Sequence, residues 1–139
     1  EFVKPEEIYG LEVDVFAPCA LGAILNDQTI PTLKARIIAG TANNVLEDED
    51  KHGPMIKERG ILYAPDFVIN AGGLINVSHE PGGYDRDAAI YDIEKIFDRL
   101  LDIYQISDEQ NIHTQLAAKV FAKRRIAQIA ELHSNYIKR

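Results

Sequence analysis

The sequence predicts an α/β fold, an incomplete doubly wound (Rossmann-like) parallel sheet followed by long C-terminal helices. In the first half of the 139 residues, short β-rich apolar runs alternate with helical patterns, as in parallel sheets covered on both faces. In the second half, apolar residues recur only at helical spacing. We therefore expect two parts, the C-terminal part of a nucleotide-binding domain at 1–83 and a helical segment at 84–139 that packs on it.

The elements of the first half follow from local signals. Pro5–Gly10 predicts a single helical turn, with proline at its start and glycine as its stop. Helices are also expected at 49–59, where Gly60 ends the pattern, and at 71–79. Between these helices lie four β-rich runs, at residues 11–16, 36–40, 61–63 and 67–69.

The second half predicts two long helices joined by a break at 107–111. Apolar residues of the first helix step by three and four, and Asp85 and Asp87 suit the positive end of its dipole. The second helix is expected from 112 to 136. Its apolar stripe comprises Ala118, Ala122, Ile126 and Ile129. We expect the two helices to run antiparallel and to bury both stripes in a core, against each other or against the sheet.

Composition excludes several classes of function. A net charge of −7 disfavours nucleic acid, whose phosphates repel an acidic surface. No apolar run approaches the roughly 20 residues that span a bilayer, so no membrane partner is expected. The single cysteine, Cys19, excludes an internal disulfide and agrees with a reducing, cytoplasmic location. The four histidines are scattered without metal-ligand spacing, and we expect no metal site.

Three loops after β-rich runs are candidate ligand contacts: Pro18–Gly22, Thr41–Asn44 and Asn70–Gly73. Open α/β sheets bind ligands beyond the carboxyl ends of their strands. Small residues let a backbone approach a flat ligand, and carboxamides hydrogen-bond it without adding charge. The alternative is a structural role for the same residues: a helix N-cap for Asn70, turn positions for Asn43 and Asn44, and close helix–strand packing for Gly72 and Gly73.

Three long runs resemble the amino-acid dehydrogenases that act on glutamate, leucine, phenylalanine and valine. They are DVFAPCALGA (14–23), IAGTANN (38–44) and GILYAPDFVINAGG (60–73), and they keep the family's order. The resemblance extends over nearly the whole chain. The family's glycine-rich phosphate loop and its catalytic lysines and aspartate match no position here. We therefore assign no catalytic residue, and we expect this chain to be inactive without the N-terminal part of the same enzyme.

The resemblance implies NAD as the cofactor. Cys19, Ala20 and Leu21 would border its ribose, and Asn44 would meet the nicotinamide and the substrate. The implied reaction is a reversible oxidative deamination. A hydride passes from the α-carbon of an L-amino acid to C4 of the nicotinamide, and water hydrolyses the imine to a 2-oxo acid and ammonia.

The segment GLINV at residues 73–77 looks most like the leucine-specific members of the family, which implies L-leucine or a related branched-chain amino acid as substrate. Asn70, Gly72 and Gly73 would shape the floor below the substrate. Leu74 and Val77 would line the pocket for its side chain, since positions i and i+3 share a helix face.

Two alternatives remain open. One keeps the family and changes the substrate to phenylalanine or valine. The other is a non-catalytic oligomerisation or ligand-binding module, suggested by the absent phosphate loop and by long helices suited to subunit contacts. Either way, we expect a homo-oligomer.

Overall fold

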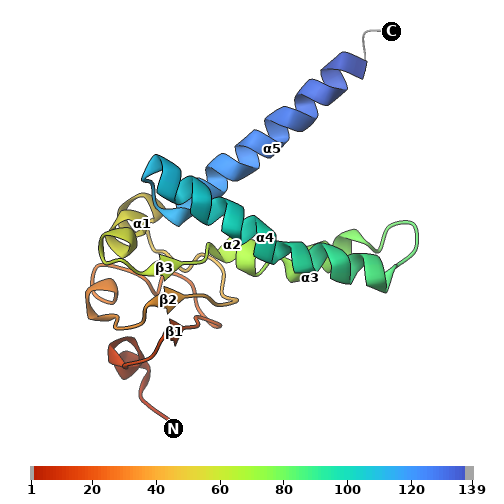
Figure 1. The fold of residues 1–139 in the computed structure, drawn as a ribbon. Coiled ribbons are helices and arrows are strands. Elements are labelled where there is room, and N and C mark those ends of the chain that lie inside the picture. Colours follow the sequence, from red (N-terminus) through yellow and green to blue (C-terminus); the bar gives the residue numbers. More distant parts are fainter. Residues whose placement is uncertain (1, 137–139) are drawn as a thin grey trace.

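Three short parallel strands form the sheet of this computed structural model, which describes residues 2–136, with side chains as far as residue 132. The strands are β1 (Val15–Phe16), β2 (Ile37–Ile38) and β3 (Leu62–Tyr63), in the order β1-β2-β3 (Figure 1). Val15 pairs with Ile37, and Ile37 pairs with Leu62. The predicted incomplete parallel sheet is confirmed.

The first strand is shorter than the predicted run at 11–16. Residues 11–14 are not strand, because Val13 N–H donates to the carbonyl of Leu11 within the segment (3.1 Å) and its side chain is exposed. The helical turn before it is confirmed as a 3-10 helix, η1 (Pro5–Gly10).

The main core lies between the sheet, α1 (Glu49–Glu58) and the short 3-10 helix η2 (Ile30–Thr32). Its fully buried members include Leu25, Leu33, Ile38 and Ile56, and burying each such side chain contributes about 1.5–3 kcal/mol. Asp48 caps α1 by accepting the N–H groups of Asp50 and Lys51. The predicted helix at 49–59 is confirmed.

The run at 67–69 is helical, so its prediction as a β-rich run is wrong. It forms α2 (Asp66–Ile69), in which Val68 and Ile69 both donate to the carbonyl of Pro65 (3.0 and 3.1 Å). The helix predicted at 71–79 follows as α3 (Gly72–Ser78). Asn70 ends α2, and Ala71 holds the N-cap position of α3, so the N-cap role for Asn70 is also wrong.

The two long helices are α4 (Arg86–Gln110) and α5 (Thr114–Tyr136). The predicted break between them is present, but it lies at 111–113 rather than 107–111, since α4 continues to Gln110 and ends at Asn111, whose φ of 51° is left-handed. Ser107 is accommodated inside this helix because its hydroxyl donates to the carbonyl of Ile112 (2.5 Å).

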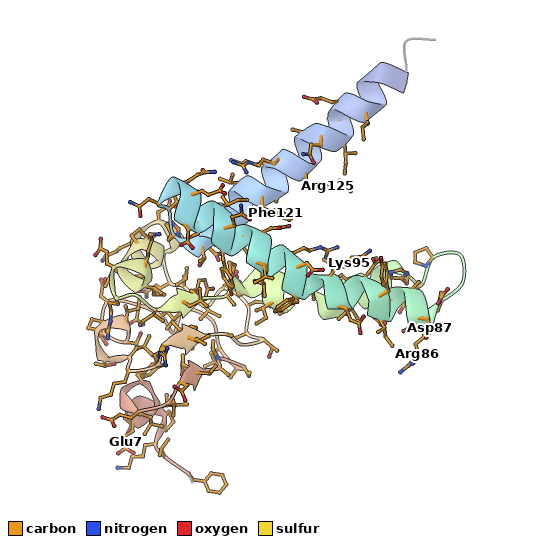
Figure 2. All side chains as sticks on the ribbon, viewed as in Figure 1. Glu7, Arg86, Asp87, Lys95, Phe121 and Arg125 are labelled. Carbon is orange, nitrogen blue, oxygen red and sulfur yellow. The ribbon has the colours of Figure 1, made fainter. Side chains whose placement is uncertain are left out.

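The first half of α5 packs against α4 and α1, where Ala117 and Ala118 are buried with Ile103 of α4. The second half projects away from the body and diverges from α4 (Figure 1). In Figure 2, Phe121 lies where the two helices still meet, and Arg125 lies on the projecting part.

The predicted burial of both stripes is therefore wrong in part. Ile126 is 67% exposed, and Ala122, Ile129 and Phe97 are also exposed. Within residues 2–136, no helix has both the length and the apolarity to cross a membrane.

Candidate functional site

The loops after β1 and β2 lie side by side beyond the carboxyl ends of these strands. Ala42 N–H donates to the carbonyl of Pro18 (2.9 Å), and Ala23 N–H donates to that of Asn44 (2.7 Å). Gly40 allows this approach, because a Cβ at this position would overlap the backbone of Pro18. The two loops therefore form one continuous rim, which we define as residues 18–23 and 41–45.

Cys19, Ala20 and Leu21 all lie exposed on this rim. Hydrogen bonds from the side chain and the backbone of Thr41 lower the pKa of the Cys19 thiol. These contacts link the loop after β1 to the loop after β2. Cys19, Ala20 and Leu21 form a surface of small and apolar residues that is accessible to a ligand.

Asn43, rather than Asn44, joins the rim to α2. The side-chain amide of Asn70 donates to Oδ1 of Asn43 (2.5 Å), with a longer contact to the carbonyl of Thr41 (3.4 Å). Asn44 is exposed and has a left-handed φ of 52°. The structure thus gathers Cys19, Asn44 and Asn70 along one edge of the sheet through Thr41 and Asn43.

An open cleft of about 660 Å³ lies between the rim and the start of α3. It is lined by uncharged residues: Thr41, Asn43, Phe67, Ile69, Asn70, Ala71, Gly72, Gly73 and Leu74. Leu74 is 77% exposed beside it. Val77 is 54% exposed on the next turn of α3 and does not line the cleft. Thr41 and Asn43 belong to a loop that the sequence indicated as a candidate ligand contact, whereas Phe67 and Ile69 are cleft residues that sequence reasoning did not single out.

Asp66 is a buried carboxylate directly behind the rim. Its side chain accepts Val45 N–H at Oδ2 (3.0 Å) and Phe67 N–H at Oδ1 (2.8 Å). Val45 lies 21 residues earlier in the sequence. No local pattern could have found this pairing, since it depends on how β2 and α2 meet in space.

The chemistry of the rim fits a nicotinamide coenzyme. Small exposed residues permit close approach of a flat ring and a ribose, and the exposed carboxamide of Asn44 can both donate and accept hydrogen bonds. Among the described side chains, no three His, Cys, Asp or Glu residues are grouped to hold a metal ion. His133, one of the four histidines of the sequence, has its side chain outside the described residues.

A family model described as Glutamate/Leucine/Phenylalanine/Valine dehydrogenase matches residues 1–134. Leucine dehydrogenase of Bacillus cereus is 52% identical over 136 residues, which cover 98% of this chain and 37% of that protein. L-tryptophan dehydrogenase of Nostoc punctiforme is 56% identical over 125 residues, which cover 90% of this chain and 35% of that protein.

Two solved structures extend the comparison. The crystal structure of the Nostoc punctiforme L-tryptophan dehydrogenase matches 91% of this chain and 38% of its own, with a TM-score of 0.88. The hetero-hexameric glutamate dehydrogenase of Thermus thermophilus, at 20% identity over 94% of this chain and 33% of its own, shares the fold with a TM-score of 0.71. The chain spans about a third of the length of these relatives.

Proposed function

Because the chain belongs to the glutamate/leucine/phenylalanine/valine dehydrogenase family, we propose that it is part of an NAD-dependent leucine dehydrogenase that reversibly deaminates branched-chain L-amino acids. Residues 1–83 would be the C-terminal part of the NAD-binding domain, and 84–139 the helical segment that packs on it. The single observation that carries the proposal is that Cys19 and Asn44 of the rim and Asn70 at the end of α2 are gathered along one edge of the sheet through Thr41 and Asn43.

In this proposal Cys19, Ala20 and Leu21 border the ribose of the coenzyme, and Asn44 meets the nicotinamide. Their exposure on the rim supports these roles. The chemistry that NAD supplies when bound is acceptance of a hydride from the α-carbon of the amino acid. The residues of this chain orient the two reactants, and none is assigned as an acid or a base.

The substrate would lie in the cleft, with Asn70, Gly72 and Gly73 below it and with Leu74 and Val77 beside its side chain. The absence of charge among the cleft-lining residues favours an apolar side chain over glutamate. Leucine is supported by dehydrogenases of that name that are 49–52% identical to this chain.

An aromatic substrate is the second candidate within the family. The relative from Nostoc punctiforme, 56% identical, is an L-tryptophan dehydrogenase, and a phenylalanine dehydrogenase is 42% identical. The open cleft, with Phe67 in its wall, is compatible with a larger side chain. Phenylalanine and tryptophan therefore belong in any substrate comparison. Valine, the other alternative within the family, is compared with them.

The proposal also covers the oligomeric state and the cellular location of the enzyme. A homo-oligomer is supported by the apolar residues exposed on the projecting half of α5, including Ile126 and Ile129. The exposed free thiol of Cys19 is compatible with the proposed cytoplasmic location.

The experiment is an assay of amino-acid-dependent reduction of NAD by the complete protein, with leucine, valine, phenylalanine and tryptophan compared at equal concentration. We expect the highest kcat/KM for leucine, whereas a higher value for tryptophan would favour the aromatic alternative. Residues 1–139 alone are expected to show no turnover. No turnover of any of the four by the complete protein would contradict the proposal.

A further inference from the structure

We infer that Asp66 is a positioning residue for this reaction, whose buried carboxylate holds the loop after β2 where it meets coenzyme and substrate. The inference rests on the proposed function and extends it to a residue that touches neither ligand. Its structural basis is the pair of contacts that α2 makes with residues 41–45, one from each end of the helix.

The carboxylate of Asp66 is buried and satisfied almost entirely by backbone amides. Asp66 is 5% exposed, and its two oxygens accept the N–H groups of Val45 and Phe67. No ion pair to it occurs among the described residues. Amide hydrogen bonds to a carboxylate are roughly twice as strong as those between neutral groups, and a buried charge without partners would be very costly. Val45 is thus held firmly at this point.

The second contact comes from the other end of α2. Asn70, which ends the helix, donates to Asn43, and Asp66, which begins it, accepts from Val45. The helix is a single turn that packs against α4. It therefore connects residues 43 and 45 to a long, rigid element.

Asn44 lies between these two anchored residues. Its left-handed φ of 52° is uncommon for a residue with a side chain. Its carbonyl accepts from Ala23 on the neighbouring loop (2.7 Å). Holding Val45 in place keeps the Asn44 backbone in this conformation, so its side chain points from a fixed position on the rim.

A simple helix-capping role does not account for these contacts. The caps of α1 and α4, Asp48 and Asp85, are exposed and accept N–H groups two and three residues ahead in their own helices. Asp66 is buried, and one of its two partners belongs to a loop 21 residues away. Asp85 is therefore a matched control for the same aspartate-to-asparagine change at the start of a helix.

The test uses the complete enzyme with Asp66→Asn, which replaces one of the two accepting oxygens by an NH₂ group that faces the N–H of Val45 or of Phe67. Asp85→Asn is the control. For Asp66→Asn we expect the Kd of NADH, measured by its fluorescence, to rise roughly tenfold, and kcat per folded active site to fall by a similar factor, because small displacements of orienting groups are costly. For Asp85→Asn both values should stay within about twofold of the parent enzyme, because asparagine caps a helix about as well as aspartate. Equal values for Asp66→Asn and the parent enzyme would overturn the inference.

A second measurement covers the case in which Asp66→Asn does not fold. Asp66→Ser retains a short acceptor at the start of α2 and removes the oxygen that reaches Val45. Hydrogen exchange followed by mass spectrometry should show slow exchange of the Val45 amide in the parent enzyme and at least roughly tenfold faster exchange in Asp66→Ser, since that amide loses its acceptor. Fast exchange of this amide in the parent enzyme would show that Asp66 does not hold Val45 and would overturn the inference directly. Slow exchange in a parent protein that neither binds NADH nor turns over amino acids would support the contact between Asp66 and Val45. It would contradict the proposed function alone.

Discussion

The side-chain nitrogen of Asn70 lies 2.5 Å from Oδ1 of Asn43, across 27 residues of sequence. This bond joins the end of α2 to the loop after β2 at the mouth of the cleft. Neither residue is buried, so the bond contributes about 1 kcal/mol or less to folding. Its main consequence is the fixed orientation of two carboxamides toward the site.

Replacing Asn70 should separate activity from stability. In the complete enzyme we expect Asn70→Ala to lower kcat/KM for the amino acid at least tenfold, while the free energy of unfolding changes by about 1 kcal/mol or less. Gln105→Ala is the matched control, because Gln105 makes a comparable exposed bond to Glu109 on α4, away from the cleft (2.7 Å). Equal activity of both variants would show that Asn70 has no role in the site.

Enlarging Val77 should alter the choice of substrate. If its side chain lies beside that of the substrate, Val77→Phe should lower kcat/KM for leucine more than for smaller amino acids, since the added ring occupies the space of the larger substrate. Leu116→Phe, at a partly exposed position on α5, controls for a surface phenylalanine. An unchanged ratio of leucine to alanine turnover would show that Val77 lies outside the pocket.

Gly40 should tolerate no side chain. Because its Cβ would overlap the backbone of Pro18, Gly40→Ala should destabilise the protein by about 2–3 kcal/mol, as overpacking does. Gly10→Ala has open space around the new methyl group and should change stability by about 0.5 kcal/mol at most. Denaturant unfolding compares the two, and similar midpoints would disprove the close approach of the two loops.

His113 should make stability depend on pH below neutrality. Its ring packs against Gly53 of α1, and burial lowers its pKa, although the carboxylates of Asp50 and Glu49 act in the opposite direction. Above an unfolded-state pKa of about 6.5 the ring is neutral in both states. As the pH falls below this value toward the lower folded-state pKa, the unfolded state binds the proton more readily and stability is lost.

His113→Asn removes this titration and leaves a side chain suited to the start of α5. The decrease in Tm between pH 7 and pH 5 should therefore be smaller for the variant than for the parent protein. The same decrease in both proteins would show that His113 does not cause the pH dependence of stability.

Local signals were sufficient to predict most of the fold. Proline at the start of η1 and Gly60 after α1 limit these elements in the sequence as they do in the structure. The run at 67–69 was misassigned because three apolar residues fit a strand and a helical turn equally well. What decides between them is the carbonyl of Pro65, which accepts from both Val68 and Ile69.

Other features could not be predicted because they depend on distant partners. The periodicity of α5 indicates an apolar face, but it does not show that Ile126 on this face stays exposed. That Asn43 rather than Asn44 lines the cleft and contacts Asn70 likewise needed coordinates, since only the meeting of β2 and α2 determines which carboxamide lies there. The buried Asp66 could not be predicted for the same reason, because its partner Val45 lies 21 residues earlier in the sequence.

The most direct test of this account is a crystal structure of the complete protein with NAD bound. We expect the nicotinamide within hydrogen-bonding distance of Asn44, with its ribose against Cys19, Ala20 and Leu21. Coenzyme bound elsewhere, with residues 18–23 and 41–45 free of it, would contradict the account.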